Sequence, residues 1–293
     1  MTLGIIPNIS KTNILQIVME IIGQLRLYSY NYIICDSLLK VVEKNNRLHE
    51  NELLPLKELI KKSDMVISIG GDGTMLTTAY EVRKTSTPII GVNFGKLGFL
   101  AEFDIDSFKD LLKEIKNKNY IVDERMALVG GNSLENGKEL YAINDIVVEK
   151  APYPKMIDLT IKVDEDYVAT FSADGIIIAT PTGSTGYSLS TGGPIVNPGA
   201  DVITISPIAP HSLTMRPLVV SSKQKIMVMV QSHYGKIQVS CDGQRSYIYD
   251  SPTSIEVKKS KQSVKLVHSN KTNYFETLRN KLYWGLDVRK GNG

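Results

Sequence analysis

The fold of this 293-residue chain is decided by the stretch Met65-Val-Ile-Ser-Ile-Gly-Gly-Asp-Gly-Thr-Met-Leu76. Its apolar start, Met65 to Ile69, predicts a buried parallel strand. Glycines then break the strand, and a helical pattern begins at Thr74. A strand, a glycine-rich turn and a helix start together predict a phosphate-binding turn. Glycine lets backbone N–H groups approach an anion, and the helix N-terminus adds partial positive charge.

Asp72 does not suit a passive anion-binding turn. Its carboxylate stands where phosphate oxygens would lie, and the two repel unless a cation bridges them or a substrate hydroxyl lies between them. We therefore predict that Asp72 handles a hydroxyl that is being phosphorylated. The alternative is a tight turn that merely links strand to helix.

The composition is that of an ordinary globular protein, with 42% hydrophobic and 22% charged residues. A net charge of +3 is too small to argue for nucleic acid. The cysteines, Cys35 and Cys241, show no CxxC spacing, which indicates a reducing compartment and no structural zinc. Because we find neither a signal peptide nor an apolar run of transmembrane length, we expect a cytoplasmic protein with no membrane partner.

The first hundred residues alternate strand and helix patterns. Apolar runs at Leu3–Ile6, Tyr32–Cys35 and Pro88–Asn93 predict strands, and helical spacing marks the segments between them. Such alternation requires crossover connections. It predicts a doubly wound, mostly parallel sheet whose ligands lie at the carboxyl ends of the strands.

Strand-like runs dominate residues 101–269 and predict a second, β-rich domain, a sandwich or curled sheet. Near the C-terminus, Phe275, Leu278 and Leu282 recur at helical spacing. A lone helix cannot bury its apolar face by itself, so it must dock. We expect it to return to the α/β domain, which would then comprise residues 1–100 and 270–293.

A second group of polar residues lies in 174–190, where an apolar strand runs into Thr-Pro-Thr-Gly-Ser-Thr-Gly-Tyr-Ser-Leu-Ser190. Hydroxyls and bare amides suit a polyhydroxylated ligand such as a nucleotide, and Tyr187 can pack on a base. A Ser/Thr-rich turn that satisfies its own backbone is the alternative. We prefer the alternative for any single hydroxyl, but not for the whole block.

Asn144-Asp145 interrupts an apolar run, Tyr141–Val148. Neighbouring residues of a strand point to opposite faces, and the pair can hold ribose hydroxyls from a strand end. A strand that emerges at a turn explains the pair equally well. Asp242-Gly-Gln-Arg245 is most simply a hairpin turn.

Together these residues resemble the NAD kinase family, the enzymes that make NADP. The motifs follow the family order over about residues 1–245: Gly70-Gly-Asp-Gly73, Asn93-Phe-Gly-Lys-Leu-Gly-Phe99, Asn144-Asp145, Thr180-Pro-Thr-Gly-Ser-Thr-Gly-Tyr-Ser-Leu-Ser-Thr-Gly-Gly-Pro194, Pro210-His-Ser-Leu-Thr-Met-Arg-Pro217 and Asp242-Gly-Gln244. Gly-Gly-Asp-Gly alone is shared with 6-phosphofructokinases and with diacylglycerol and sphingosine kinases. The Thr-Pro-Thr-Gly block is far more specific.

The resemblance implies an N-terminal α/β domain, a C-terminal β domain and NAD held between them, often within a homotetramer. It implies that Asp72 is the catalytic aspartate and that Thr185–Ser190 grip the adenosine half of NAD. The NAD-binding positions it implies are Asp72, Gly73, Asn144, Asp145, Lys155, Asp174, Thr182, Thr185, Gly186, Tyr187, Ser188, Leu189, Ser190, Ala209 and Gln244. Two positions depart from the family. Asp145 stands where glutamate is commoner, and Gly186 where alanine is common.

The reaction that the resemblance implies is transfer of the γ-phosphoryl group of ATP, or of polyphosphate, to the adenosine 2′-hydroxyl of NAD. The predicted binders of the donor phosphates are the backbone amides of Gly70, Gly71, Gly73 and Thr74. Mg²⁺ is the expected cofactor, because it offsets the repulsion between phosphates and Asp72. The sequence assigns no protein ligand to the metal.

Two other functions compete. A diacylglycerol-type lipid kinase would want a membrane-facing surface, and the sequence has no amphipathic basic helix. A non-catalytic NAD-binding regulator would keep the pocket without the reaction. Asp72 speaks against this, since binding alone needs no acid beside phosphates.

Overall fold

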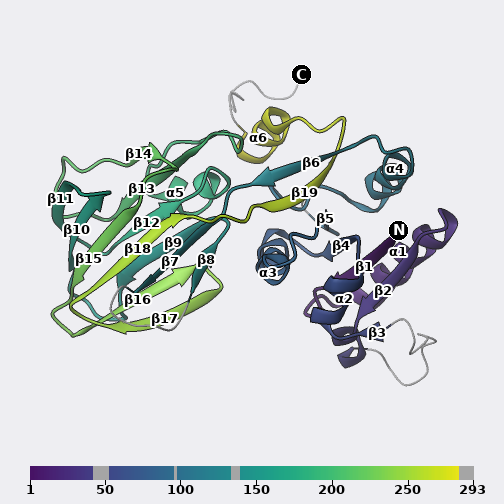
Figure 1. Ribbon diagram of the computed structural model, residues 1–293, viewed down its shortest axis with the longest axis horizontal. Helices are drawn as coiled ribbons and strands as arrows, with labels where there is room; N and C mark the ends of the chain where they lie inside the picture. The colour runs from purple at the N-terminus through teal and green to yellow at the C-terminus, as the bar shows by residue number, and fades with distance from the viewer. Residues whose placement is uncertain (42–52, 96–97, 133–138, 284–293) are drawn as a thin grey trace. The chain divides into compact units, whose positions relative to one another are not determined.

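The computed structural model of the chain describes residues 1–41, 53–95, 98–132 and 139–283 (Figure 1). It forms two compact units: unit 1, of Met1–Glu124 with Lys265–Gly293, and unit 2, of Arg125–Val264. The sequence prediction ended the first domain at residue 100 and resumed it at residue 270. Unit 1 extends further because β6 (Tyr120–Arg125) and β19 (Val264–Ser269) are neighbours in its sheet.

Unit 1 is built on a seven-stranded sheet with the order β3-β2-β1-β4-β5-β19-β6. The pairs from β3 through to β19 are parallel. Its first five strands follow the order 3-2-1-4-5, which is that of a doubly wound fold and confirms the prediction. The remaining strands are β1 Thr2–Pro7, β2 Asn31–Cys35, β3 Leu53–Leu54, β4 Met65–Ile69 and β5 Ile89–Val92.

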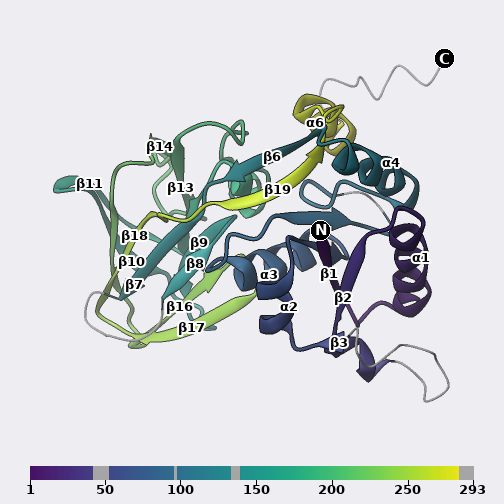
Figure 2. The same cartoon turned by 45° about the vertical axis from the view of Figure 1, so that its right-hand side comes forward.

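Helices cover both faces of this sheet (Figure 2). A Cβ on Gly4 of β1 would lie 2.5 Å from Leu59 Cδ2 of α2, whereas Leu3 and Ile5 share a buried cluster with α1 and α4. Successive side chains of a strand point to opposite faces, so α2 lies opposite α1 and α4. The helices of unit 1 are α1 Ile14–Leu27, η1 Asp36–Lys40, α2 Leu56–Lys62, α3 Asp72–Val82, α4 Ile105–Lys116 and α6 Tyr274–Leu282.

The C-terminal segment returns to unit 1, as the sequence predicted. Strand β19 pairs with β5 at Leu266 and Ile89, and α6 follows it. Asn273 caps α6, because its side chain accepts the N–H of Phe275 at 2.9 Å. Among the helices of the described residues, none combines the length and apolar character that crossing a membrane requires.

Unit 2 is a sandwich of two six-stranded antiparallel sheets, ordered β11-β10-β15-β18-β7-β8 and β14-β13-β12-β9-β16-β17. One buried cluster draws apolar side chains from both sheets, which is why they stack face to face and confirms the predicted β-sandwich. Its elements are β7 Leu128–Asn132, β8 Leu140–Ala142, β9 Asp145–Lys150, β10 Ile157–Val163, β11 Asp166–Ala173, β12 Gly175–Ala179, η3 Thr182–Thr185, α5 Tyr187–Ser190, β13 Val202–Ile208, β14 Leu218–Ser221, β15 Ile226–Gln231, β16 Lys236–Cys241, β17 Arg245–Asp250 and β18 Thr253–Lys259.

Candidate active site

The glycine turn lies between β4 and α3 in unit 1. Gly71 is the N-cap of α3, and the helix begins at Asp72, two residues earlier than the pattern predicted. A glycine at position 73 costs only about 1 kcal/mol in a helix, so it does not delay the helix start. Asp72 therefore lies in the first turn, where the helix dipole favours a carboxylate.

The second glycine loop holds the Asp72 carboxylate in place. Oδ1 accepts the N–H groups of Leu100 at 2.9 Å and Ala101 at 3.1 Å, and Oδ2 accepts that of Phe99 at 2.9 Å. Only glycine allows this approach at position 98, because a Cβ there would lie 1.8 Å from Oδ1. Lys96 and Leu97, in the middle of the predicted motif, lie outside the described residues.

These bonds leave Asp72 limited capacity for a substrate. A carboxylate offers about four lone-pair positions. Three are occupied by backbone N–H groups, two on Oδ1 and one on Oδ2. The remaining position is on Oδ2, and it can accept one hydroxyl proton.

Among the predicted donor-phosphate amides, those of Gly70 and Thr74 bind within the protein, whereas that of Gly71 resembles that of its neighbour Asp72. The N–H of Gly70 donates to the Val92 carbonyl at 2.8 Å, and that of Thr74 to the Gly71 carbonyl at 2.9 Å. These two are already occupied. The N–H groups of Gly71 and Asp72 make no hydrogen bond to another described residue. They stand at the N-terminus of an 11-residue helix, where an anion is favoured.

Asn144 lies at a bend in unit 2, and Asp145 is the first residue of the strand that follows it. Strand β8 ends at Ala142 and β9 begins at Asp145, so the pair lies where a strand emerges from a turn, and its contact with ribose hydroxyls stays a prediction. The cause of the bend is the Asp242 carboxylate, whose Oδ1 accepts the N–H groups of Asn144 at 2.7 Å and Asp145 at 3.3 Å. Those amides are thereby withdrawn from a regular strand ladder.

The Thr-Pro-Thr-Gly block packs directly on this bend. The N–H of Thr180 donates to the Asn144 carbonyl at 2.9 Å. Gly183 approaches the same peptide so closely that a Cβ would lie 2.1 Å from the Asn144 oxygen. A Cβ on Gly186 would lie 3.7 Å from Asn144 Nδ2 and 3.8 Å from Asp145 Oδ2. The structure thus brings two distant motifs together.

Most hydroxyls of the block bind within the protein. Ser184, Thr185 and Ser190 each donate to the carbonyl three residues earlier, at 2.7, 3.3 and 2.8 Å. Ser188 bonds Ser206, and Thr182 accepts from Arg125 at 3.5 Å. Each of these hydroxyls therefore has a partner within the protein, while its contact with NAD stays a prediction.

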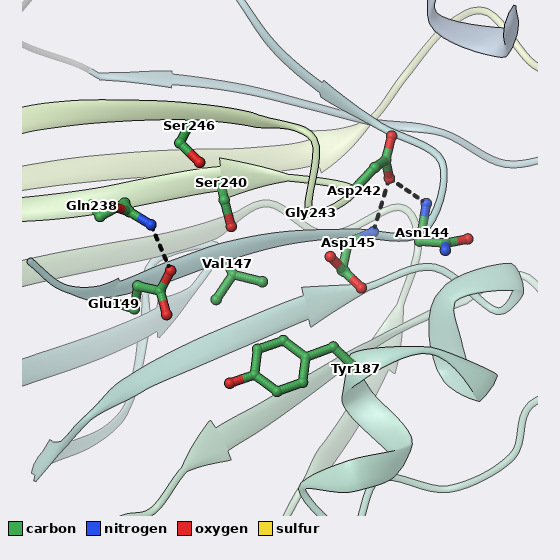
Figure 3. A pocket seen from close by; sticks show the side chains of 10 residues that line it. All are labelled: Asn144, Asp145, Val147, Glu149, Tyr187, Gln238, Ser240, Asp242, Gly243 and Ser246. Carbon is green, nitrogen blue, oxygen red and sulfur yellow. Dashed lines mark hydrogen bonds between the residues drawn. The ribbon is translucent and has the colours of Figure 1, made fainter. Parts of the chain in front are cut away.

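A cavity of about 420 Å³ opens beside these motifs in unit 2 (Figure 3). Strand β9 lines it with Asp145, Val147 and Glu149, and β16 with Gln238 and Ser240. The half-exposed ring of Tyr187 on α5 lies across from them. Of the sequence-predicted residues, the cavity unites Asn144, Asp145 and Tyr187.

The cavity is acidic. Asp145, Glu149 and Asp242 contribute carboxyl groups, and its lining contains no lysine or arginine. Burial, and then the nearby Asp242 charge, raise the pKa of Asp145 to about 7. Burial also raises the pKa of Tyr187, assisted by three carboxylates of which Glu149 acts most strongly. Such a cavity repels phosphate and suits a sugar or base that donates hydrogen bonds.

Replacing Asp145 with Asn is expected to raise stability at alkaline pH. The pKa of this carboxyl is about 7 when folded, against an ordinary 3.8, so the folded state holds the proton more tightly. That stabilisation is complete below pH 3.8 and is lost as the pH rises through about 7. Melting temperatures of the two proteins should therefore diverge between about pH 4 and pH 7, with the wild type falling.

A matched control for this comparison is Asp250→Asn, which changes a carboxylate that is 81% exposed. Its melting temperature should follow that of the wild type across the same pH range. If the melting temperature of the Asp145 variant also followed that of the wild type at every pH, burial of the Asp145 charge would have no cost in stability.

Other predicted residues lie apart from the cavity. Asp174 pairs with Lys150 at 2.7 Å, and Lys155 is exposed in the loop after β9. Ala209, with φ of +43°, is exposed just past β13, and Gln244 is exposed in the β16–β17 turn. None of these four residues lines the cavity.

The prediction missed Val147, Glu149, Gln238 and Ser240. A signal for them existed, since residues 145, 147 and 149 share one face of a strand, as do 238 and 240. It needed the pairing of β9 with β16, which sets Glu149 opposite Gln238. The Gln238 amide donates to Glu149 Oε1 at 3.0 Å (Figure 3).

The described residues contain no group of three His, Cys, Asp or Glu side chains that could hold a metal ion. Asp72 adds only a single acceptor position. This donor set fits a Mg²⁺ ion held chiefly by substrate phosphates and water, which is the usual habit of that ion.

Two family models match the chain. The ATP-NAD kinase N-terminal domain matches residues 3–120, and the ATP-NAD kinase C-terminal domain matches residues 143–269. These ranges contain the glycine turn and the cavity, respectively.

Full-length relatives carry the same description. The NAD kinase of Chlorobium phaeobacteroides (strain BS1) is 39% identical over 99% of this chain and 100% of its own length. The NAD kinase of Prosthecochloris aestuarii is 38% identical over the whole of both chains.

Solved structures agree with these relatives. Yeast NADH kinase complexed with NADH superposes with a TM-score of 0.89 at 25% identity, covering 99% of this chain and 90% of that one. An NAD kinase from Archaeoglobus fulgidus in complex with ATP gives 0.76 at 28% identity, covering 97% and 99%. With both family models and full-length relatives in agreement, this chain belongs to the NAD kinase family.

Proposed function

We propose that this chain transfers the γ-phosphoryl group of ATP to the adenosine 2′-hydroxyl of NAD, and that Asp72 receives the proton of that hydroxyl. Its activity is that of an NAD kinase. The observation that supports the role of Asp72 is a carboxylate fixed by three backbone N–H groups, with one acceptor position left on Oδ2. A hydroxyl bound there would be oriented for attack.

The phosphoryl donor would lie at the start of α3. Phosphoryl transfer passes through a loose transition state whose charge spreads over the phosphoryl oxygens, so catalysis consists mainly of positioning and charge neutralisation. The N–H groups of Gly71 and Asp72 have no other partner among the described residues and can bind those oxygens. Mg²⁺ would arrive bound to ATP and offset the charge that repels Asp72.

The cavity of unit 2 would hold a sugar or base of NAD. Its carboxyl groups disfavour the pyrophosphate and favour hydroxyl donors. Asn144 supports this role, since its Oδ1 is buried without a hydrogen-bond partner among the described residues. The Asp145 carboxyl also makes no hydrogen bond or ion pair to a described residue, although the residue is only 4% exposed. Ligand hydroxyls would satisfy both.

Substituting Asn144 with Ala should therefore raise the KM for NAD by about tenfold and leave the KM for ATP within about twofold. The reason is that the amide contacts the acceptor and not the donor. Steady-state kinetics with each substrate varied in turn measure both constants. Equal effects on the two would place Asn144 outside the NAD site.

The test of the function is NADP formation from NAD with ATP, other nucleoside triphosphates or polyphosphate, each with and without Mg²⁺. We expect NADP with ATP and Mg²⁺, and none when the metal is removed by a chelator. NAD binding by calorimetry without any NADP would instead indicate a nucleotide-binding regulator. Co-sedimentation with lipid vesicles would instead indicate a lipid kinase.

We also propose that the enzyme is cytoplasmic, as the sequence predicts, and a homo-oligomer, as the family resemblance implies. Self-association is supported by apolar residues on the edge strand β14, where Leu218 and Val219 are 40% and 44% exposed, and by Leu213, which is 90% exposed. Light scattering coupled to gel filtration measures the assembly, and a monomeric mass would refute it.

A further inference from the structure

The β16–β17 turn contains a carboxylate that a turn does not require. Asp242 and Gly243 both have positive φ, at +55° and +63°, and the N–H of Gln244 donates to the Cys241 carbonyl at 3.0 Å. This is the Asp-Gly hairpin turn that the sequence predicts. A residue at the tip of such a turn normally faces solvent, but the Asp242 side chain is 0% exposed.

The Asp242 carboxylate binds three consecutive backbone amides that are distant from it in the sequence. It accepts the N–H group of Ile143 at 2.9 Å. It also accepts those of Asn144 at 2.7 Å and Asp145 at 3.3 Å (Figure 3). A backbone hydrogen bond also joins the two segments, because the N–H of Asp242 donates to the Asp145 carbonyl at 2.9 Å. The bend that carries the candidate NAD-binding pair is therefore built around this one side chain.

Arg245 completes the arrangement. One of its nitrogens donates to Asp242 Oδ2 at 3.1 Å and to the Tyr141 carbonyl at 2.9 Å. The backbone of the bend is fully engaged, while the Asn144 and Asp145 side chains keep their capacity for a ligand. Groups that do not touch the ligand but orient the side chains that bind it commonly contribute about 10- to 100-fold to affinity.

We propose that Asp242 is a positioning residue for NAD: its carboxylate holds the Ile143–Asp145 backbone so that the side chains of Asn144 and Asp145 face the ligand. The inference rests on the proposed function, because it takes NAD as that ligand. It assigns Asp242 a role through its neighbours and not through contact with the reacting atoms.

The same carboxylate sets the charge of Asp145. Its negative charge is one of the two causes that raise the pKa of Asp145 to about 7, the other being burial. The titratable groups that interact with Asp145 are Asp242 of the hairpin, the Cys241 thiol of β16 and Tyr187 of α5. Arg245 pairs with Asp242, and Glu149 of the same strand lines the same cavity. NAD affinity should rise with pH through about 7, because ionised Asp145 accepts hydroxyl protons more strongly.

Three variants separate geometry from charge. Asp242→Asn keeps the shape but removes the charge, so it should weaken NAD binding about tenfold and move the pH midpoint below that of the wild type. Asp242→Glu keeps the charge but displaces it, so it should weaken binding while its midpoint stays nearer to the wild-type value than that of Asp242→Asn. Asp250→Asn, on the neighbouring strand β17, is the control and should change neither property.

The measurement is the dissociation constant of NAD by calorimetry from about pH 5.5 to pH 8.5, together with the KM for ATP. The KM for ATP should stay within about twofold, because Asp242 does not act on the donor. NAD affinity that stays within about twofold in Asp242→Asn overturns the positioning role. An unmoved midpoint overturns the effect on Asp145, since loss of a purely structural turn would lower stability without shifting a titration.

A variant that fails to fold does not end the test. Arg245→Gln leaves the three amides on Asp242 and removes only the cationic partner of that carboxylate, so it should weaken NAD binding less than Asp242→Asn does. NAD binding that is weakened as much by Arg245→Gln as by Asp242→Asn contradicts the positioning role of the carboxylate. Calorimetry needs no turnover, so failure to form NADP would refute the proposed reaction while these binding results still decide the role of Asp242.

Discussion

Asp72→Asn is expected to lower the turnover of NADP formation by about 10²–10⁴-fold while the KM for NAD changes little. An amide cannot accept the proton of the attacking 2′-hydroxyl, although it is nearly the same size as the carboxylate. The NAD contacts that we propose in unit 2 are unchanged in this variant, so most of the binding should remain. Steady-state rates at saturating NAD and ATP, with the melting temperature recorded in parallel, measure the effect.

The control for this variant is Asp106→Asn. Asp106 is also an acid in the first turn of a helix, α4, but it is exposed and has no role in the site. Its rate should equal that of the wild type. Turnover of the Asp72 variant within about threefold of the wild type would show that another group takes the proton.

Gly183→Ala should weaken NAD binding by at least about tenfold and destabilise the protein by about 1–3 kcal/mol. The added methyl would lie 2.1 Å from the Asn144 carbonyl oxygen and 2.4 Å from its carbon. Neither is the end of a flexible side chain, so the backbone of the bend must move. That movement displaces the Asn144 and Asp145 side chains from the cavity.

Thermal unfolding and the KM for NAD measure the two effects of this glycine. Gly131→Ala is the matched control, since a Cβ at that position meets nothing within 4 Å. It should leave the KM unchanged. If Gly183→Ala bound NAD as tightly as the wild type, the contact between the Thr-Pro-Thr-Gly block and the Asn144-Asp145 pair would have no part in NAD binding.

Local patterns predicted much of the fold. Buried apolar runs separated by helical spacing indicated the parallel sheet of unit 1, and dense strand patterns indicated the sandwich of unit 2. The boundaries were less accurate. The helix after the glycine turn begins at Asp72 and not at Thr74. Residues 101–124 belong to unit 1, because pairing at the edge of its sheet is a long-range property that no local pattern reveals.

The residue types of the site were also predictable, but their arrangement was not. The sequence pattern indicated Asp72 and Asn144-Asp145. It did not indicate which backbone amides bind the Asp72 carboxylate. Asp72 is held by N–H groups 27 to 29 residues away. Glu149 and Gln238 looked like ordinary strand residues until the register of β9 and β16 set them side by side.

By itself, the sequence determined the glycine turn, the two kinds of domain and the family, because each depends on residues that are close together along the chain. Only the tertiary structure decided that Asp242, which looked like a plain turn residue, closes on backbone amides 97 to 99 positions away. The physical reason is strand register. Pairing of Cys241 with Ile146 places the turn beside the bend, and a buried carboxylate there must find hydrogen-bond donors.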